Sequence, residues 1–587
     1  MSVTDRTWDL SILYNGFDDP RYQNDFASLD TLIAAANDLA GKMDGMTDTD
    51  VVKAYIDGAV KMNETVEKLF IYANLRYSAN TGDTEAASIQ GQLMAKLSAT
   101  AAADTRIQSR IAAADLDAVL AEAPELEEFR YLLTNIRNDS RYLLSDKEEA
   151  LFAKMDISGA SAWGDLQSSL TSTLKVDYNG TQITLPAVRN LAYDPDPEVR
   201  KAAYEAEVAA CEKIDESVAF SLNSIKLQVL NECELRGYES PLAKSLYTSR
   251  MKRETLDALI SAMEDYMPVF RRYLRAKAKY LGHEGGLPWY DLFAPVGSAD
   301  KKYTVEDAKE YLLNIFGKFD TELHDMVKAA FDEAWIDFYP REGKVGGAFD
   351  CGVPSAYQSR VLTNFDGSFS DVVTLAHELG HSFHDRQVFC HNILNQGYSM
   401  PVAETASTFN EVLVMETAIA ETDDKNTKLA LMESQLQDAC QIICDIYSRY
   451  TFEASVFEAR PAEFMSAERM CELMLAAQEK AYGEGLSTFH RYMWLVKGHY
   501  YSGGLSFYNF PYAFGGLFAR GLYAKYKETG AEFVPVYKKM LRETSMNTVE
   551  DCAKIAGIDL TEKSFWEAGL KSLADRIDEF CALAEEK

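Results

Sequence analysis

The chain has 587 residues, 47% of them hydrophobic, and a formal net charge of −32 at pH 7. A chain of this length exceeds what one hydrophobic core holds, so we expect two or more subdomains. The acidic excess argues against nucleic acid and membrane partners, because phosphate contacts need clustered Lys and Arg. It is compatible with cationic peptides, although an acidic cytosolic protein is the simpler interpretation.

Cysteine usage and hydropathy point to a reducing compartment. The nine cysteines are scattered along the chain. Cys440 and Cys444 lie four apart on a predicted helix, but no second pair accompanies them, and free cysteines are commonly small core residues. No run of about 18 apolar residues is present, and the opening residues lack the apolar core of a signal peptide. We therefore expect a cytoplasmic protein that does not associate with membranes.

Helical patterns dominate the first part of the chain. Alanine-rich segments such as 86–102 place apolar residues three and four positions apart, which predicts amphipathic helices. Residues 175–185 predict a β-hairpin, because two strand-like segments flank an Asn-Gly turn. We place a boundary near residue 190, with an N-terminal helical domain over 1–190 and a second domain over 191–587.

Helical patterns resume over 198–281 and 304–338, and then the composition changes. Residues 343–351 and 358–365 read as short strands, and an Asp-Gly turn signal follows them. The predicted fold class is therefore mostly α, with a small β-sheet just before the chain's most informative motif.

That motif is His377-Glu378-Leu379-Gly380-His381, an H-E-x-x-H sequence. Ser370 can cap the N-terminus of a helix, and Asp371 suits the positive end of its dipole. Residues four apart lie on one helix face, so His377 and His381 can offer two imidazoles to one metal ion. Glu378, between them, is then placed beside the metal and a water molecule.

A catalytic zinc needs a third protein ligand, which the motif itself does not supply. The extended pattern H-E-x-x-H-x-x-G-x-x-H fails, because His384 and Gln387 occupy the relevant positions. A second helix is predicted over 402–412, with Glu404 and Glu411 on one face. Its small and apolar neighbours favour burial of these carboxylates, and a buried carboxylate needs a partner.

These residues carry a family resemblance. The sequence T-L-A-H-E-L-G-H-S-F-H, followed by A-E-T-A-S-T-F-N-E, resembles the M3 family of zinc oligopeptidases, and its oligoendopeptidase F branch in particular. By position, the resemblance implies one Zn²⁺ per chain, held by His377, His381 and Glu404. It also implies that Glu378 is the general base that activates the zinc-bound water.

The resemblance also implies an overall architecture. The opening W-D-L-x-x-L-Y at residues 8–14 is similar to the start of oligoendopeptidase F proteins. The family fold is a helical ellipsoid of two subdomains around a central channel that admits short, unfolded peptides. Residues 191–587 would then form the M3-type zinc peptidase catalytic domain.

Further site residues are expected around the metal. Glu411 is a candidate to orient a ligand histidine from the second shell. His384, one turn past His381, is either a second-shell residue or a satisfied core histidine. A peptide can add to the edge of the predicted sheet, and Gly346 and Gly347 can form a flexible loop over it. An ordinary hairpin with a glycine bend is the alternative.

The segment 498–513 combines one histidine with four tyrosines around a glycine pair. Tyrosines usually have structural roles. In M3 peptidases, however, a His/Tyr-rich segment at this place supplies donors to the transition-state oxyanion. The resemblance therefore implies such a role here, and we rank Tyr512 and Tyr508 first, His499 next and Tyr501 last, with Tyr501 as a substrate contact.

The predicted reaction is hydrolysis of internal bonds in short peptides. A dipeptidyl carboxypeptidase of the same family would need a cationic site for the terminal carboxylate, which the sequence does not exclude. A non-catalytic peptide-binding protein on the same scaffold is a third reading, and the intact Glu378 argues against it. Oligomeric state and peptide preference are open from sequence.

Overall fold

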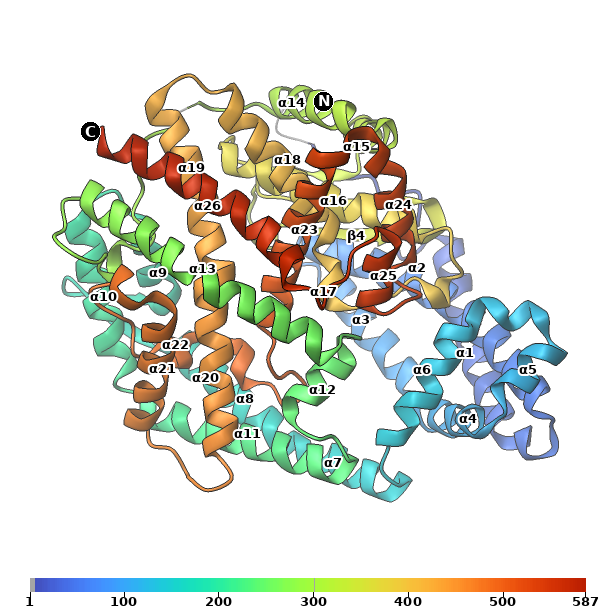
Figure 1. Cartoon of the computed structure of the whole chain (residues 1–587). Coiled ribbons are helices and arrows are strands. Elements are labelled where there is room, and N and C mark those ends of the chain that lie inside the picture. Colours follow the sequence, from blue (N-terminus) through green and yellow to red (C-terminus); the bar gives the residue numbers. More distant parts are fainter. Residues whose placement is uncertain (1–5, 300, 587) are drawn as a thin grey trace.

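Helices make up most of the structure, as the composition predicts (Figure 1). The computed structural model describes residues 6–299 and 301–586. The first five residues, part of the stretch expected to lack a signal peptide, lie outside that description. None of the described helices is long and apolar enough to cross a membrane.

The helices lie between the following residues. The first group is α1 (Pro20–Lys42), α2 (Asp48–Ala79), α3 (Thr84–Leu97), α4 (Ala101–Ala113), α5 (Leu116–Glu122), α6 (Arg130–Asp139), α7 (Asp146–Ser158) and α8 (Ala160–Thr173). The middle group is α9 (Leu185–Asn190), α10 (Pro197–Cys211), α11 (Asp215–Arg236), α12 (Pro241–Thr248), α13 (Arg253–Tyr280), α14 (Val305–Phe319) and α15 (Thr321–Asp332). The last group is α16 (Phe369–Val388), α17 (Met400–Ala403), α18 (Thr405–Glu421), α19 (Lys425–Cys440), α20 (Ile446–Ala459), α21 (Ala467–Tyr482), α22 (Met493–Val496), α23 (Phe510–Thr529), α24 (Phe533–Glu543), α25 (Val549–Ile555) and α26 (Lys563–Glu585).

The N-terminal helices have hydrophobic cores of their own. One core joins residues between Leu39 and Ile136, and Figure 1 shows the helices α1, α4 and α5 of this part as a lobe at the right of the view. A much larger core extends from Ala160 to Ala584. The predicted domain boundary at residue 190 and the predicted channel between two subdomains stay predictions.

The expected β-hairpin is present. Strands β1 (Lys175–Tyr178) and β2 (Thr181–Thr184) pair antiparallel. Asn179 and Gly180 between them both have positive φ, 50° and 78°, as a type I′ turn requires.

A second, three-stranded sheet precedes the H-E-x-x-H helix, in the order β3-β5-β4. Its strands are β3 (Ile336–Asp337), β4 (Phe349–Val353) and β5 (Gln358–Leu362). Successive side chains of a strand point to opposite faces. Val361 therefore joins the large core, whereas Leu362 packs with the N-terminal helices. The strand β4 lies at the edge of this sheet and contacts α16.

The predicted strand over 343–351 begins later than expected. Residues before Phe349 form a loop, because Gly343 and Gly347 adopt positive φ of 81° and 80°. The buried ammonium of Lys344 anchors this loop through the Asp337 carboxylate at 2.8 Å. The strand predicted to end at residue 365 ends at Leu362.

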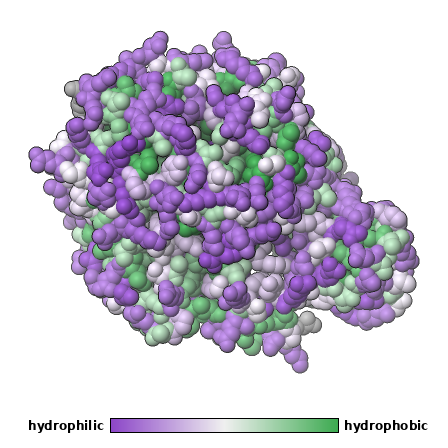
Figure 2. Space-filling model, viewed as in Figure 1, coloured by the Kyte–Doolittle hydropathy of each residue, from purple (hydrophilic) through white to green (hydrophobic). Residues whose placement is uncertain are grey.

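The surface carries hydrophilic and hydrophobic side chains unevenly. The face drawn in Figure 2 is mostly hydrophilic, interrupted by smaller hydrophobic areas.

Candidate active site

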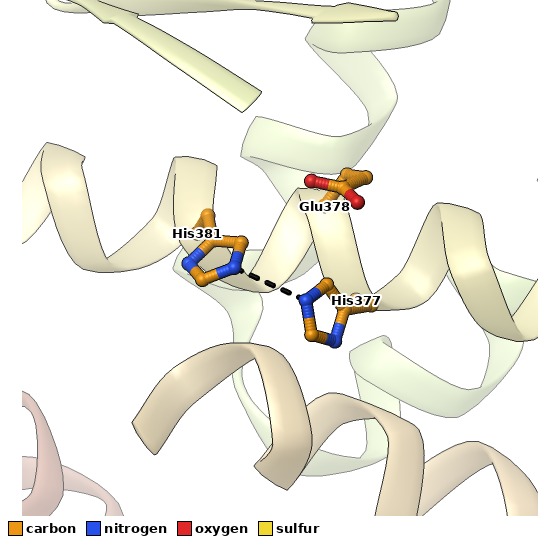
Figure 3. A group of neighbouring side chains, drawn as sticks. All are labelled: His377, Glu378 and His381. Atoms are coloured by element: carbon orange, nitrogen blue, oxygen red, sulfur yellow. Dashed lines mark hydrogen bonds between the residues drawn. The ribbon is translucent and has the colours of Figure 1, made fainter. Parts of the chain in front are cut away.

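The helix α16 holds the H-E-x-x-H motif. Its N-cap is Ser368 rather than the predicted Ser370: the Ser368 hydroxyl accepts from the Asp371 backbone N–H, and the Asp371 carboxylate accepts from the Ser368 N–H. This capping box starts the helix two residues earlier than expected. His377 and His381 point from one face, with their Nε2 atoms 3.1 Å apart (Figure 3).

Glu404 reaches the two imidazoles because α16 and α18 approach closely. A methyl group at Gly380 would lie 2.5 Å from the Cα of Ser407, so only glycine permits this packing. Glu404 lies between α17 and α18, where the predicted continuous helix over 402–412 is interrupted. Its Oε2 is 3.4 Å from Nε2 of His377 and 3.4 Å from Nε2 of His381.

These three atoms suit a tetrahedral metal ion. Bonds of the usual length to zinc place neighbouring ligand atoms about 3.3 Å apart in a tetrahedron. The three separations, 3.1, 3.4 and 3.4 Å, match that spacing. Three protein ligands leave a fourth position for water or substrate, which is the pattern of catalytic rather than structural zinc sites.

Glu411 fixes the ring of His377. Its Oε1 lies 2.6 Å from Nδ1 of His377, which leaves Nε2 as the free ligand atom. Burial alone would lower the pKa of His377, but the Glu411 hydrogen bond and the charges of Glu411, Glu378 and Glu404 raise it to about 9. A site with this excess of carboxylate charge favours a cation.

The Glu378 side chain is placed for proton transfer. It projects from α16 beside the two imidazoles (Figure 3) and is 6% exposed. No hydrogen bond within the described residues holds its carboxylate. Burial raises its pKa above the ordinary value, the neighbouring histidines lower it, and Glu404 and Glu411 raise it. A free carboxylate with a raised pKa suits a general base.

Two of the candidate oxyanion donors, Tyr508 and Tyr512, lie just before and within α23, the helix that packs on Glu404. A methyl group at Gly515 of α23 would lie 2.9 Å from Cβ of Glu404, so α23 packs directly on this ligand. Tyr512 is three residues earlier, on the same face of α23. The ring of His499 lies 5.2 Å from that of Tyr508 and 6.1 Å from that of Tyr512.

The electrostatics agree with this placement. Burial raises the pKa of Tyr512, and the Tyr508 hydroxyl and the Glu404 carboxylate raise it further. Burial lowers the pKa of His499, and the positive charges of Arg449 and Lys497 lower it further. His499 is thus a neutral imidazole at pH 7, and Tyr512 a neutral phenol, each with a proton to donate.

Two other predicted residues lie elsewhere. Tyr501 is buried in the core, where its hydroxyl donates to the Trp494 carbonyl at 3.1 Å. We therefore correct its expected role as a substrate contact. His384 is fully buried, 2.8 Å from the Thr544 hydroxyl and stacked on the Tyr398 ring. It lies in the core, as in the second of the two readings, but its Nδ1 atom has no hydrogen-bond partner within the described residues. No hydrogen bond among those residues joins it to His377, His381 or Glu404.

Gly346 and Gly347, which are expected to form a loop over the substrate, have open space around them. A methyl group at Gly346 or Gly347 would meet no atom within 4 Å. The Asn364 amide holds the loop by donating to the carbonyls of Val345 at 3.0 Å and Gly347 at 2.8 Å. Contact of this loop with substrate stays a prediction.

A buried pair of acids beside the motif was not predicted from the sequence. Ser382 of α16 donates to Asp350 Oδ1 of β4 at 2.6 Å, and Asp350 lies against Asp385. Burial and the Asp385 charge raise the pKa of Asp350 well above its usual value. The hydrogen bond from Ser382 to Asp350 therefore links the edge strand to the metal helix. The spacing of Asp385, four residues after His381, is the only sequence signal for it.

Two imidazoles and a carboxylate around a free glutamate form the arrangement of a metallopeptidase centre. The family model of peptidase family M3 matches residues 190–572, and a second model, described as Oligopeptidase F, matches 109–175. The chain belongs to peptidase family M3, and it is a peptidase.

Individual relatives extend the match over the whole chain. Oligopeptidase PepF of Bacillus subtilis is 25% identical over 98% of this chain and 86% of its own length. An oligoendopeptidase F homolog of Lactococcus lactis is 26% identical over 99% of this chain and 97% of its own. These matches confirm the oligoendopeptidase F resemblance.

Solved structures confirm the helical fold. A putative peptidase from Chlamydophila abortus superimposes with a TM-score of 0.86 at 21% identity, covering 99% of both chains. Oligoendopeptidase F from Enterococcus faecium gives a TM-score of 0.72 at 19% identity, covering 97% of this chain and 99% of its own.

Proposed function

We propose that this protein is a zinc oligoendopeptidase that cleaves internal bonds of short, unfolded peptides in the cytoplasm. The observation that carries the proposal is the convergence of His377 Nε2, His381 Nε2 and Glu404 Oε2 at 3.1 to 3.4 Å. One Zn²⁺ per chain is bound there. Glu411 holds the ring of His377, and Gly346 and Gly347 contact the substrate.

The chemistry is divided among the chain's own residues. When bound, zinc polarises the scissile carbonyl and makes water a better nucleophile. Glu378 accepts a proton from the attacking water and delivers it to the leaving amine. Tyr508, Tyr512 and His499 donate hydrogen bonds to the oxyanion that forms as the carbonyl becomes tetrahedral.

The sheet supports binding of an extended peptide. The strand β4 is an edge strand that packs on α16. An added peptide strand would bond to its backbone, which aligns substrates without requiring one sequence. Cleavage within the peptide follows, because backbone pairing does not need a free terminus.

The test combines metal analysis with product analysis. Internally quenched peptides of graded length are incubated with the purified chain, with and without chelator, and products are identified by mass. We expect one zinc per chain, internal cleavage and loss of turnover on chelation. Release of C-terminal dipeptides alone would indicate the carboxypeptidase alternative, and zinc-loaded protein without turnover would indicate a binding protein.

A matched pair of histidine variants locates the metal. His381→Ala removes a ligand and should abolish stoichiometric zinc. His324→Ala, at a partly exposed histidine of α15 that pairs with Asp325, should keep it. Full zinc occupancy in His381→Ala contradicts the assignment.

A further inference from the structure

A lysine without a charge partner lies in the wall of a cavity of about 320 Å³. The cavity lies between α9 and α10 on one side and α19 and α22 on the other, and Lys497 follows α22 directly. The Lys497 side chain is mostly buried. Within residues 6–299 and 301–586, no hydrogen bond or ion pair holds its ammonium group.

Three other lysines, whose side chains are fully buried, each have a carboxylate partner. Lys226 pairs with Glu453 at 2.7 Å, Lys277 pairs with Glu433, and Lys344 pairs with Asp337 at 2.8 Å. Such pairing is the rule, since a buried charge without a partner costs several kcal/mol. Lys497 departs from this rule. Because its side chain lies in a cavity wall, a ligand in the cavity can supply the carboxylate partner.

Lys497 and Asp438 are the two charged lining residues that have no ion pair among the described residues. Arg189 pairs with Glu207, Arg200 with Asp291, and Arg449 with Asp445, so each of these pairs is neutral. Arg189, Glu207, Arg200 and Asp445 line the same cavity. Burial raises the pKa of Asp438 to about 7, so this carboxyl is partly protonated at pH 7. Burial lowers the pKa of Lys497 to about 8, so the ammonium still carries its charge at pH 7.

Lys497 lies close to one residue of the proposed reaction centre, His499, and its charge lowers the pKa of that histidine. Lys497 precedes the oxyanion candidate His499 by two residues, which limits their Cα separation to about 7 Å. The same cavity is lined by Asp438, which also lines a second cavity of about 240 Å³. Glu411, the partner of His377, lines that second cavity. Asp438 is thus common to the linings of both cavities.

We infer that Lys497 forms a carboxylate-recognition subsite, which selects peptides with an acidic group close to the scissile bond. The inference rests on the proposed peptidase function and adds a substrate class to it. The carboxylate belongs either to an acidic side chain or to the peptide's own C-terminus, and both present the same two oxygens to the ammonium.

The test uses twin peptides that differ by one charge. One set replaces Glu by Gln at each position around the cleaved bond, and a second compares a free C-terminus with an amide. For the zinc-loaded wild type, we expect kcat/KM to be about tenfold or more higher for the charged twin than for the uncharged one. This is the scale of a hydrogen bond to a charged group. The set that shows the preference identifies the source of the carboxylate.

Variants assign the preference to Lys497. In Lys497→Gln the ratio of kcat/KM between twins should fall to near one, and Lys497→Arg should restore most of it. Lys571→Gln is the matched control, because Lys571 pairs with Asp575 on the exposed face of α26. A ratio near one in the wild type for both sets, or an unchanged ratio in folded Lys497→Gln, overturns the inference.

A binding measurement separates this result from the peptidase proposal. Fluorescent versions of the same twins are titrated into zinc-loaded Glu378→Gln protein. Tighter binding of the charged twin, lost on adding Lys497→Gln, supports the subsite even without turnover. Equal binding of both twins overturns the subsite, while internal cleavage by the wild type would leave the peptidase proposal standing.

Discussion

The metal-binding helices and the tyrosine segment meet at Glu404, but they are held in different ways. His377 and His381 lie inside one long helix, and Gly380 brings the backbone of α18 against it. Tyr508 instead follows a loop in which Phe507 has a positive φ of 53°, an unusual conformation for a bulky residue.

The difference separates positions that helix geometry determines from positions that tertiary packing determines. The two ligand histidines need only an α-helix to face one ion. The donors His499, Tyr508 and Tyr512 come from two separate stretches, which tertiary packing brings into ring contact with one another. The helix α23 packs on Glu404 through Gly515. We call the ligand helices α16 and α18 the helix side and the segment from His499 to Tyr512 the packing side. Variants on these two sides should therefore affect metal binding, turnover and stability differently.

The largest expected effect lies on the helix side. Glu378→Gln keeps the size of the side chain but cannot accept a proton from water, so kcat should fall by about 10²- to 10⁴-fold. Zinc content and peptide affinity should be retained, because Glu378 is not a ligand. Metal analysis and a peptide titration accompany the kinetics. Retention of more than a few per cent of activity would assign the base elsewhere.

The next effect tests the packing side. Tyr512→Phe and Tyr508→Phe each remove one donor to an oxyanion that exists only in the transition state. We expect kcat and kcat/KM to fall together by about 10²- to 10³-fold per hydroxyl, with KM nearly constant. Steady-state kinetics on one quenched peptide measures this. If both variants stay within a factor of about three of wild type, against that expected scale, His499 becomes the leading candidate.

Sequence predicted the helix side well, for a physical reason. The spacing of His377 and His381 determines their geometry once the helix forms, and the family resemblance named Glu404. The errors concern local boundaries: Ser368 rather than Ser370 caps α16, and the predicted second helix is interrupted at Glu404. Several capping residues compete within one turn, and tertiary contacts decide among them.

Sequence was weaker for the tyrosine segment and its surroundings. Tyr501 and Tyr512 have similar local contexts, yet one hydroxyl is bonded in the core and the other lies beside Glu404. No periodicity relates them, because Tyr501 lies in a short 3₁₀ turn whereas Tyr512 lies in the first turn of α23. The sequence likewise does not predict that Lys497 lacks a partner. That depends on the nearby carboxylates being paired with other cations, as Glu207 is with Arg189 and Asp445 is with Arg449.

A smaller effect tests the link between α18 and the metal. Glu411→Gln keeps a hydrogen bond to His377 but removes the carboxylate charge. Such changes next to a ligand typically cost about 10- to 100-fold in metal affinity or activity. Zinc affinity is measured by competition with a chelator, and kcat in saturating zinc. A loss of kcat that excess zinc does not reverse would place Glu411 in catalysis rather than in holding His377.

The smallest expected effect on turnover is at Tyr501, which provides the control for the tyrosine variants. Tyr501→Phe removes the hydroxyl that donates to the Trp494 carbonyl in the core. The loss of one buried hydrogen bond should lower the free energy of unfolding by about 1 kcal/mol, seen as a lower melting temperature. The kcat should stay near that of wild type, because the hydroxyl faces away from the site.

Tyr501→Phe and Tyr512→Phe each delete one hydroxyl oxygen from the same segment. Tyr501→Phe should lower the melting temperature more, and Tyr512→Phe should lower kcat more. A large loss of kcat in Tyr501→Phe with unchanged stability would return this residue to the active site and remove the distinction between core and site tyrosines.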